Sequence, residues 1–138
     1  AYITSTLTNV TGDNTIYPLK GAIWTEVADV GTCFSNGTFT APYTGKYLFS
    51  GTLALSHANC DVFAALLVTS NRNHALSPNS NTLYATTWGF LDIPFFKIAD
   101  MEAGDTAYLS LRTNLASPVK FTDIVGGGNT QFYGYLLP

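Results

Sequence analysis

Charged side chains are scarce in this sequence. Lys, Arg, Asp and Glu make up 11% of its 138 residues, less than half of the roughly 25% typical of soluble domains. Six basic against nine acidic residues give a net charge of −3, without the basic stripe that binds nucleic acid. No uninterrupted apolar run approaches the roughly 20 residues of a membrane-spanning helix. We therefore expect neither nucleic-acid binding nor membrane insertion.

Groups for acid–base catalysis and metal binding are also few. His57 and His74 are the two imidazoles, and the sequence holds no G-x-S-x-G, H-E-x-x-H, P-loop or G-x-G-x-x-G motif. We therefore predict that the chain is not an enzyme and that it has no metal site and no cofactor. Asp100, Glu102 and Asp105 resemble a calcium loop only loosely, because their spacing does not match an EF-hand. A solvated turn is the simpler interpretation.

The two cysteines leave the redox state open. Cys33 and Cys60 have neither CxxC spacing nor a histidine cluster around them, which argues against zinc. A disulfide between them is one alternative, and two free thiols are the other. Asn9-Val10-Thr11 and Asn36-Gly37-Thr38 match the glycosylation sequon, which has meaning only in a eukaryotic secretory route.

The pattern of the chain predicts an all-β domain. No stretch keeps the apolar spacing of an amphipathic helix, whereas segments rich in Thr, Val, Tyr and Phe alternate with clusters of Gly, Asn, Asp and Pro. No repeat or linker divides the chain, so residues 1–138 are expected to form a single sandwich, jelly roll or barrel. The expected strands are Tyr2–Thr8, Thr15–Leu19, Ala22–Val30, Gly37–Ala41, Lys46–Leu55, Val62–Thr69, Leu83–Ile98 with a break at Gly89 or Pro94, Thr106–Thr113, Val119–Val125 and Thr130–Leu137.

Two of these strands alternate and so predict which side chains are buried. In Lys46–Leu55, one face carries large apolar groups and the other carries polar ones, and Thr106–Thr113 has the same pattern. Each strand is therefore expected to bury one face only. The expected buried residues are Tyr47, Phe49, Leu53, Leu55, Ala107, Leu109 and Leu111.

Two other strands are apolar on both faces. Both sets of alternating side chains are apolar in Val62–Val68 and Gln131–Leu137, although an antiparallel sheet without helices normally shows water one face. An exposed face of this kind marks an interaction site. A neighbouring subunit is the simplest cover, and loops of the same chain are the alternative. The candidate subunit contacts are Phe63, Leu67, Tyr108, Tyr133, Tyr135 and Leu137.

Three segments resemble a known family. Phe39–Phe49 (FTAPYTGKYLF) resembles the F-T-x-P-x-x-G-x-Y-x-F signature of C1q-like domains, in the C1q/tumour-necrosis-factor jelly-roll superfamily. Met101–Leu109 is similar to the segment in which a Gly-Asp turn enters a strand, and Phe132–Leu136 is similar to the F-x-G-x-L of the last strand. The resemblance spans about Thr15 to Leu137. It implies a ten-stranded antiparallel jelly-roll sandwich that assembles as a homotrimer.

Details at the two ends of the sequence point to a subgroup of this family. The sequence holds no collagen-like Gly-X-Y stretch, while Tyr2–Asp13 and Gly126–Gly128 resemble C1q-like modules of bacteriophage tail fibres and other virion appendages. The resemblance implies a receptor-recognition head on the virion surface that binds a host glycan or protein. A structural capsid-decorating protein is one alternative. A secreted, extracellular C1q-like ligand is another, for which glycans at Asn9 or Asn36 are expected.

The strongest candidate for recognition is the polar, Asn-rich segment Ser70–Asn81. Long loops on rigid β scaffolds often carry binding sites, and Asn amides with an Arg fork suit a carboxylate or a pair of sugar hydroxyls. Aromatic side chains further along can stack on a sugar ring. A plain solvated loop followed by core aromatics is the alternative. The candidate ligand-binding residues are Arg72, Asn73, His74, Asn79, Asn81, Tyr84 and Trp88.

Overall fold

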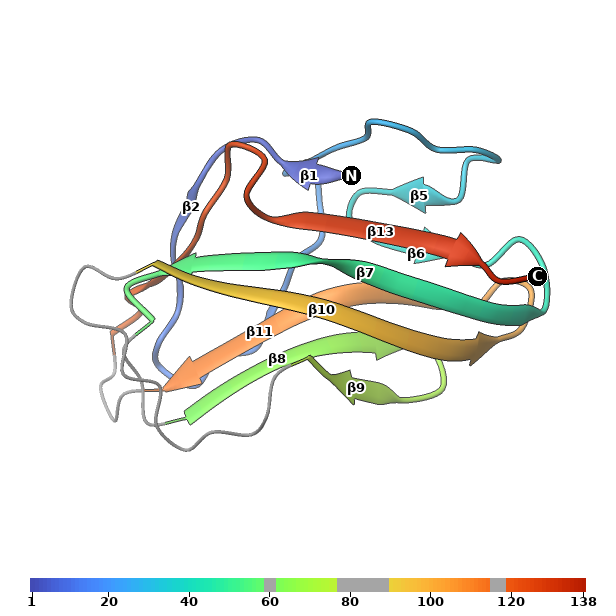
Figure 1. Ribbon diagram of the computed structural model, residues 1–138. Coiled ribbons are helices and arrows are strands. Elements are labelled where there is room, and N and C mark those ends of the chain that lie inside the picture. The colour runs from blue at the N-terminus through green and yellow to red at the C-terminus, as the bar shows by residue number, and fades with distance from the viewer. Residues whose placement is uncertain (59–61, 77–89, 115–118) are drawn as a thin grey trace.

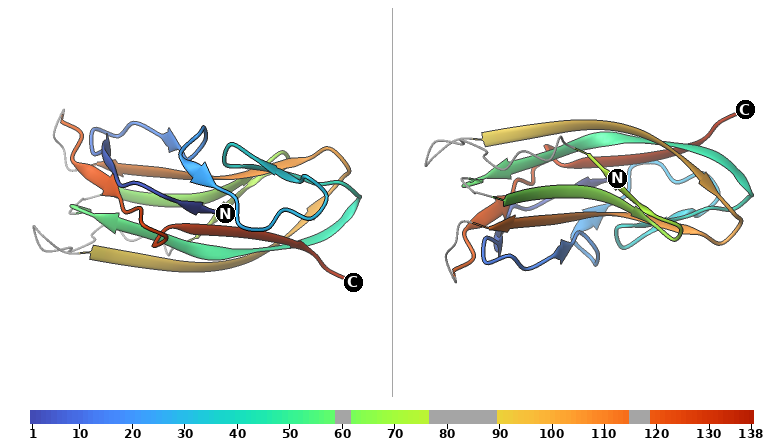
Figure 2. Two further views of the ribbon diagram at one scale, coloured as in Figure 1. Left: turned by 90° about the horizontal axis from the view of Figure 1, so that it is seen from above. Right: turned by 90° about the horizontal axis from the view of Figure 1, so that it is seen from below.

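The computed structural model describes residues 1–58, 62–76, 90–114 and 119–138. In these ranges the chain forms two antiparallel sheets that face each other as a sandwich (Figures 1 and 2). The same ranges hold no helix long and apolar enough to cross a membrane. The strands are β1 (Tyr2–Ile3), β2 (Leu7–Thr11), β3 (Tyr17–Pro18), β4 (Trp24–Thr25), β5 (Phe34–Ser35), β6 (Thr38–Thr40), β7 (Gly45–Ser56), β8 (Val62–Thr69), β9 (Asn73–Ala75), β10 (Phe90–Met101), β11 (Thr106–Asn114), β12 (Thr122–Ile124) and β13 (Gln131–Leu136).

The first sheet, called sheet A below, is built around β7. Its path is β2-β12-β7-β13-β1-β4, and β10 pairs with the other edge of β7. The β7–β10 ladder runs from Gly45 opposite Met101 to Ser56 opposite Phe90. β10 continues through Pro94 without the break considered from the sequence. Because β7 is the only described partner of β10, β10 is an edge strand, where a residue without an N–H group is tolerated.

The second sheet, called sheet B, is built around β11. Its path is β5-β6-β11-β8-β9, and β3 pairs with β11 beside β6. The β11–β8 ladder runs from Ala107 opposite Thr69 to Asn114 opposite Val62. Figure 1 shows β11 and β8 of this sheet below β7 and β10, with β9 as a short strand at its outer edge.

The inward faces of the two sheets form one core. All seven residues expected to be buried on β7 and β11 are buried, which confirms the alternation read from the sequence. Phe39 packs against Tyr47 and Phe49, with ring centroids 5.4 and 5.2 Å apart, and Phe49 stacks on Phe132 at 5.8 Å. The segment Phe39–Phe49 therefore supplies the aromatic centre of the sandwich.

A two-residue turn joins β5 to β6. Asn36 and Gly37 both have positive φ, +48° and +78°, as a type I′ hairpin requires. An Asn-Gly pair is typical of this turn, but β5 was not predicted. It is a strand of two residues that pairs Phe34 with Phe39, too short to leave an alternation in the sequence.

The expected strand Tyr2–Thr8 is divided in the structure. The loop at Gly126 lies against the chain between β1 and β2, and a Cβ on this glycine would be 2.3 Å from the carbonyl carbon of Ser5. Gly127 donates to the carbonyl of Thr4 at 2.7 Å. The loop therefore takes the place of a strand partner between β1 and β2. A comparable shortening reduces the expected strand Ala22–Val30 to β4.

Candidate binding surfaces

The outward side of sheet A carries a contiguous apolar surface, called the aromatic face below. Strand register places Tyr135 beside Leu48 and Leu48 beside Ile98. The next row joins Tyr133 to Phe96 through Ser50. The aromatic face comprises Leu48, Phe96, Ile98, Tyr133 and Tyr135.

The aromatic face is open to solvent. Phe96 is 67% exposed, Tyr135 55%, Ile98 47% and Tyr133 36%. Where β7 begins and β10 ends, the face is bounded by an exposed ion pair, in which the Lys46 ammonium donates to the Asp100 carboxylate at 2.7 Å. This ion pair lowers the pKa of Asp100. An exposed apolar patch with a polar boundary is typical of a protein–protein interface.

The predicted subunit contacts lie in three different places. Tyr133 and Tyr135 belong to the aromatic face, and Leu137 follows β13 directly, half-buried. Tyr108 lies on the outward side of sheet B, where the Lys20 ammonium is 3.6 Å from its ring centroid.

The structure corrects the prediction for Phe63 and Leu67. Their side chains lie in the core, 3% and 0% exposed, so they are not available to a second subunit. Leu67 pairs with Leu109 of β11, and this register turns both side chains inward. The outward residues of β8 are the other apolar set, Val62, Ala64, Leu66 and Val68.

The predicted recognition segment begins as a β-hairpin rather than a loop. The backbone N–H of Thr69 donates to the carbonyl of Arg72 at 3.0 Å, and the Thr69 hydroxyl donates to the same carbonyl at 2.8 Å. This tight turn leads into β9, whose Asn73 pairs with Val68. Four further candidates lie outside the described residues, and these are Asn79, Asn81, Tyr84 and Trp88.

His74 points toward the gap between the sheets beside two basic residues. It pairs with Leu67, which faces inward, and its buried Nε2 has no hydrogen-bond partner among the described residues. Burial, followed by the positive charges of Arg72 and Lys97, lowers the pKa of His74. Both cations therefore disfavour the charged form of this imidazole, and Arg72 also acts on the exposed Asp100 carboxylate. Lys97 was not predicted, because it comes from β10, in the other sheet.

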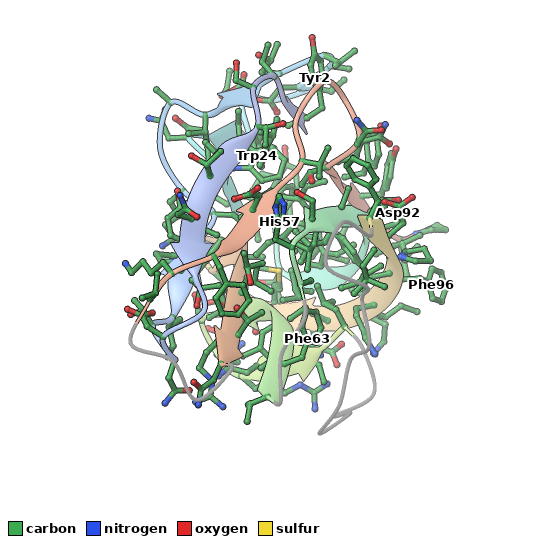
Figure 3. All side chains as sticks on the ribbon, turned by 90° about the vertical axis from the view of Figure 1, so that its left-hand side faces the viewer. Tyr2, Trp24, His57, Phe63, Asp92 and Phe96 are labelled. Atoms are coloured by element: carbon green, nitrogen blue, oxygen red, sulfur yellow. The ribbon has the colours of Figure 1, made fainter. Side chains whose placement is uncertain are left out.

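A second polar cluster lies where β7 ends, near the centre of the view in Figure 3. His57 Nδ1 is 2.8 Å from the Asp123 carboxylate, and the Ser56 hydroxyl donates to the same oxygen at 3.3 Å. The backbone N–H of Asn9 donates to the other oxygen at 2.8 Å. The serine is bound to the carboxylate rather than to the imidazole, which is not the order of a catalytic triad. No local motif predicted this cluster, because the histidine and the carboxylate are 66 residues apart.

The acidic turn before β11 has structural partners. Asp105 accepts hydrogen bonds from the backbone N–H of Glu102 at 2.9 Å and from the Asn71 amide at 3.0 Å. No group of three or more His, Cys, Asp or Glu side chains that could hold a metal ion occurs in the part of the chain that the structure describes. Cys33 carries a free, half-buried thiol, while Cys60 lies outside the described residues.

A groove with a volume of about 480 Å³ opens between β13 and residues 26–33. Its lining residues include the aromatic side chains Phe34, Phe39, Tyr47 and Phe132. Tyr43 and Leu136 line it as well. Asp29 fixes the wall opposite β13, because its carboxylate accepts from the backbone N–H groups of Cys33 and Phe34. The volume falls in the range of sites that bind ligands, about 300–1,000 Å³.

Comparison with known proteins identifies the fold. No protein-family model matches the sequence, and no curated protein matches it. The globular domain of the zebrafish complement 1qA protein aligns with a TM-score of 0.55 and 19% identity, over 88% of this chain and 84% of that one. Rabbit GITRL gives a TM-score of 0.48 at 18% identity over 76% and 74% of the two chains, and pika GITRL gives 0.40 at 19% over 88% and 96%. The first likeness confirms the predicted jelly roll, with more and shorter strands than the ten expected.

Proposed function

We propose that this chain is a non-enzymatic binding head that assembles as a homotrimer through the aromatic face. The observation that carries the proposal is the exposure of that face, where Phe96 on β10 and Tyr133 and Tyr135 on β13 lie on either side of β7. Covering such a face with a second copy removes apolar surface from water. The number three rests on the resemblance of Phe39–Phe49 to the C1q signature.

In this proposal the trimer is the receptor-recognition tip of a viral or phage fibre or spike, on the virion surface. Its ligand is a glycan or a protein of the host surface. The positively charged edge at Arg72 and Lys97 supports an acidic group in that ligand, such as a carboxylate. Three copies on one axis convert weak single-site binding into avidity.

The assembly is tested with a matched pair of variants. Phe96→Glu places a charge in the aromatic face, and Ile16→Glu places one at a similarly exposed apolar residue elsewhere, 63% against 67% exposed. Sedimentation velocity is expected to show a trimer for wild type and Ile16→Glu, and a monomer for Phe96→Glu. A Phe96→Glu variant that stays trimeric would place the interface on another face.

Recognition is tested with a second pair. Arg72→Ala is expected to weaken binding of the labelled trimer to host cells, whereas Lys120→Ala, which removes a cation from an exposed position elsewhere, is expected to leave it unchanged. Equal binding by both variants would remove the charged edge from the proposal. No cell binding by the wild-type trimer would favour the structural, capsid-decorating role.

One observation keeps the secreted-ligand alternative open. Asn9 and Asn36, the acceptors of the two sequons, are both exposed, so a glycan would meet no packing obstacle at either. The intact mass of native material decides between the two sources. The unmodified mass is expected for a virion protein, and added hexose units would identify a secreted ligand.

A further inference from the structure

The groove beside β13 borders an unpaired sheet edge. β1 covers only the first part of β13, where the Ala1 amino group donates to the carbonyl of Phe132 and the Phe132 N–H donates to the carbonyl of Ala1, both at 3.0 Å. From Tyr133 to Leu136, β13 has a single described strand partner, β7 on its other side. In the view from above in Figure 2, the blue segment before β5 lies beside the dark red strand β13.

Strand alternation shows which backbone groups face the groove. Thr130 and Phe132 bond toward β1, through Ile3 and Ala1, and Leu137 donates toward β7, to Lys46. Because successive residues of a strand point their N–H and C=O groups to opposite edges, Gly134 and Leu136 point theirs to the β1 side. In the described part of the chain nothing pairs with these four groups.

The floor of the groove beside Gly134 is aromatic. This glycine shares the inward face with Phe132, and the ring atoms of Phe39 and Phe49 lie 3.0 Å from where its Cβ would be. A residue on an added strand opposite Gly134 would direct its side chain inward. It would meet the aromatic floor formed by Phe34 and Tyr47, which suits an apolar group.

The side chains that line the groove carry negative charge. Glu26 and Asp29 are among its lining residues, and no Lys, Arg or His side chain occurs among those that the structure describes. The Ala1 amino group lines the groove as well, where burial lowers the pKa of this group and Glu26 and Asp29 act to raise it. Asp29 is already bonded to the backbone of Cys33 and Phe34. Glu26 follows β4 directly and is exposed, so it can pair with a basic side chain of an occupant.

We propose that this groove binds an extended segment of a partner protein, which adds to β13 as an antiparallel strand in line with β1. Main-chain hydrogen bonds to Gly134 and Leu136 supply affinity, as in other strand-addition complexes. Apolar side chains at alternate positions enter the groove, and a basic side chain reaches Glu26.

The probe is the pentapeptide acetyl-Thr-Val-Thr-Val-Lys-amide, in which the two valines lie opposite Leu136 and Gly134. Amide hydrogen exchange by NMR is the readout. In the free protein the amides of Gly134 and Leu136 are expected to exchange fast, while those of Tyr133 and Tyr135, bonded to β7, exchange slowly. Peptide binding is expected to slow exchange at Gly134 and Leu136 at least tenfold and to protect the Cys33 thiol from alkylation.

Two control peptides separate the contributions. N-methylation of both valines keeps the side chains and removes the donors, so it is expected to abolish binding. Replacing the Lys by Glu is expected to weaken binding. On the protein side, Glu26→Gln is expected to weaken binding about two- to fivefold, the range of an exposed ion pair, and Glu102→Gln, an exposed acid outside the groove, is expected to leave it unchanged.

Three results would overturn the inference. Equal binding of the N-methylated peptide would show that the groove takes apolar side chains without strand addition. Binding of benzyltrimethylammonium but not of the peptide would show that the groove takes small cations rather than an extended segment. Slow exchange at Gly134 and Leu136 in the free protein would show that the edge is already occupied. Tyr133 and Tyr135 belong both to the groove lining and to the aromatic face, so the assay is also run on Phe96→Glu. The peptide is expected to bind this monomeric variant, which separates strand addition from the proposed assembly.

Discussion

Gly37 lies in the β5–β6 turn with φ of +78°, directly against Trp24. The indole Nε1 of Trp24 donates to the carbonyl oxygen of Leu19 at 2.7 Å. A Cβ on Gly37 would be 2.3 Å from that oxygen and 2.5 Å from Nε1. Gly37→Ala is therefore expected to break this buried hydrogen bond as well as to strain the turn.

The expected loss of stability has three contributions. A non-glycine residue in the left-handed region costs roughly 1–2 kcal/mol. Losing a buried hydrogen bond costs about 1–3 kcal/mol, and pushing Trp24 away from Phe34 and Phe132, whose rings are 5.9 and 6.2 Å away, costs about 1 kcal/mol or more as overpacking. We expect the free energy of unfolding to fall by about 4 kcal/mol in Gly37→Ala.

Gly128→Ala is the matched control. Gly128 has φ of +86°, and no atom lies within 4 Å of its expected Cβ, so only the backbone contribution of roughly 1–2 kcal/mol remains. Urea unfolding at one fixed protein concentration measures both variants, because self-association would otherwise shift the midpoints. Equal losses in the two variants would refute the argument that contact with Trp24, rather than the turn, dominates.

Three further predictions concern the core and the polar clusters. Asp123→Asn removes the charge that holds His57 and is expected to cost roughly 2 kcal/mol in urea unfolding. Lys97→Gln is expected to raise the pKa of His74 in an NMR titration. Because folding lowers that pKa, the contribution of His74 to the free energy of unfolding is complete above about pH 6.5 and is lost as pH falls through the folded pKa. This loss of stability in acid is expected to be smaller in Lys97→Gln. Leu109→Ala, at a fully buried residue, is expected to cost about 2–5 kcal/mol in the same urea assay.

The alternation of apolar and polar residues predicted the buried face of a strand only where one of its two faces is polar. β7 and β11 each have one apolar face, so their buried residues could be read directly. β8 is apolar on both faces, and only its register with β11 decides that Phe63 and Leu67 point inward. A shift of one residue exchanges the two faces of a strand, and composition cannot set that register.

Contacts distant in sequence account for the rest of what was missed. β9 is held by backbone pairing to β8 rather than by an apolar pattern, so residues 73–75 were predicted as a loop. The His57–Asp123 pair, the approach of Lys97 to His74 and the unpaired edge at Gly134 all depend on how the strands assemble. The motif Phe39–Phe49, by contrast, is local, and it identified the jelly roll correctly.

The molar mass of the wild-type chain in solution shows whether other copies cover the aromatic face, as proposed. Light scattering behind size exclusion, repeated over a range of concentrations, gives that mass. The proposed trimer has a molar mass of three times 14.8 kDa. A constant mass of 14.8 kDa would show that Phe96, Tyr133 and Tyr135 stay exposed on a monomer, and it would contradict the proposed assembly.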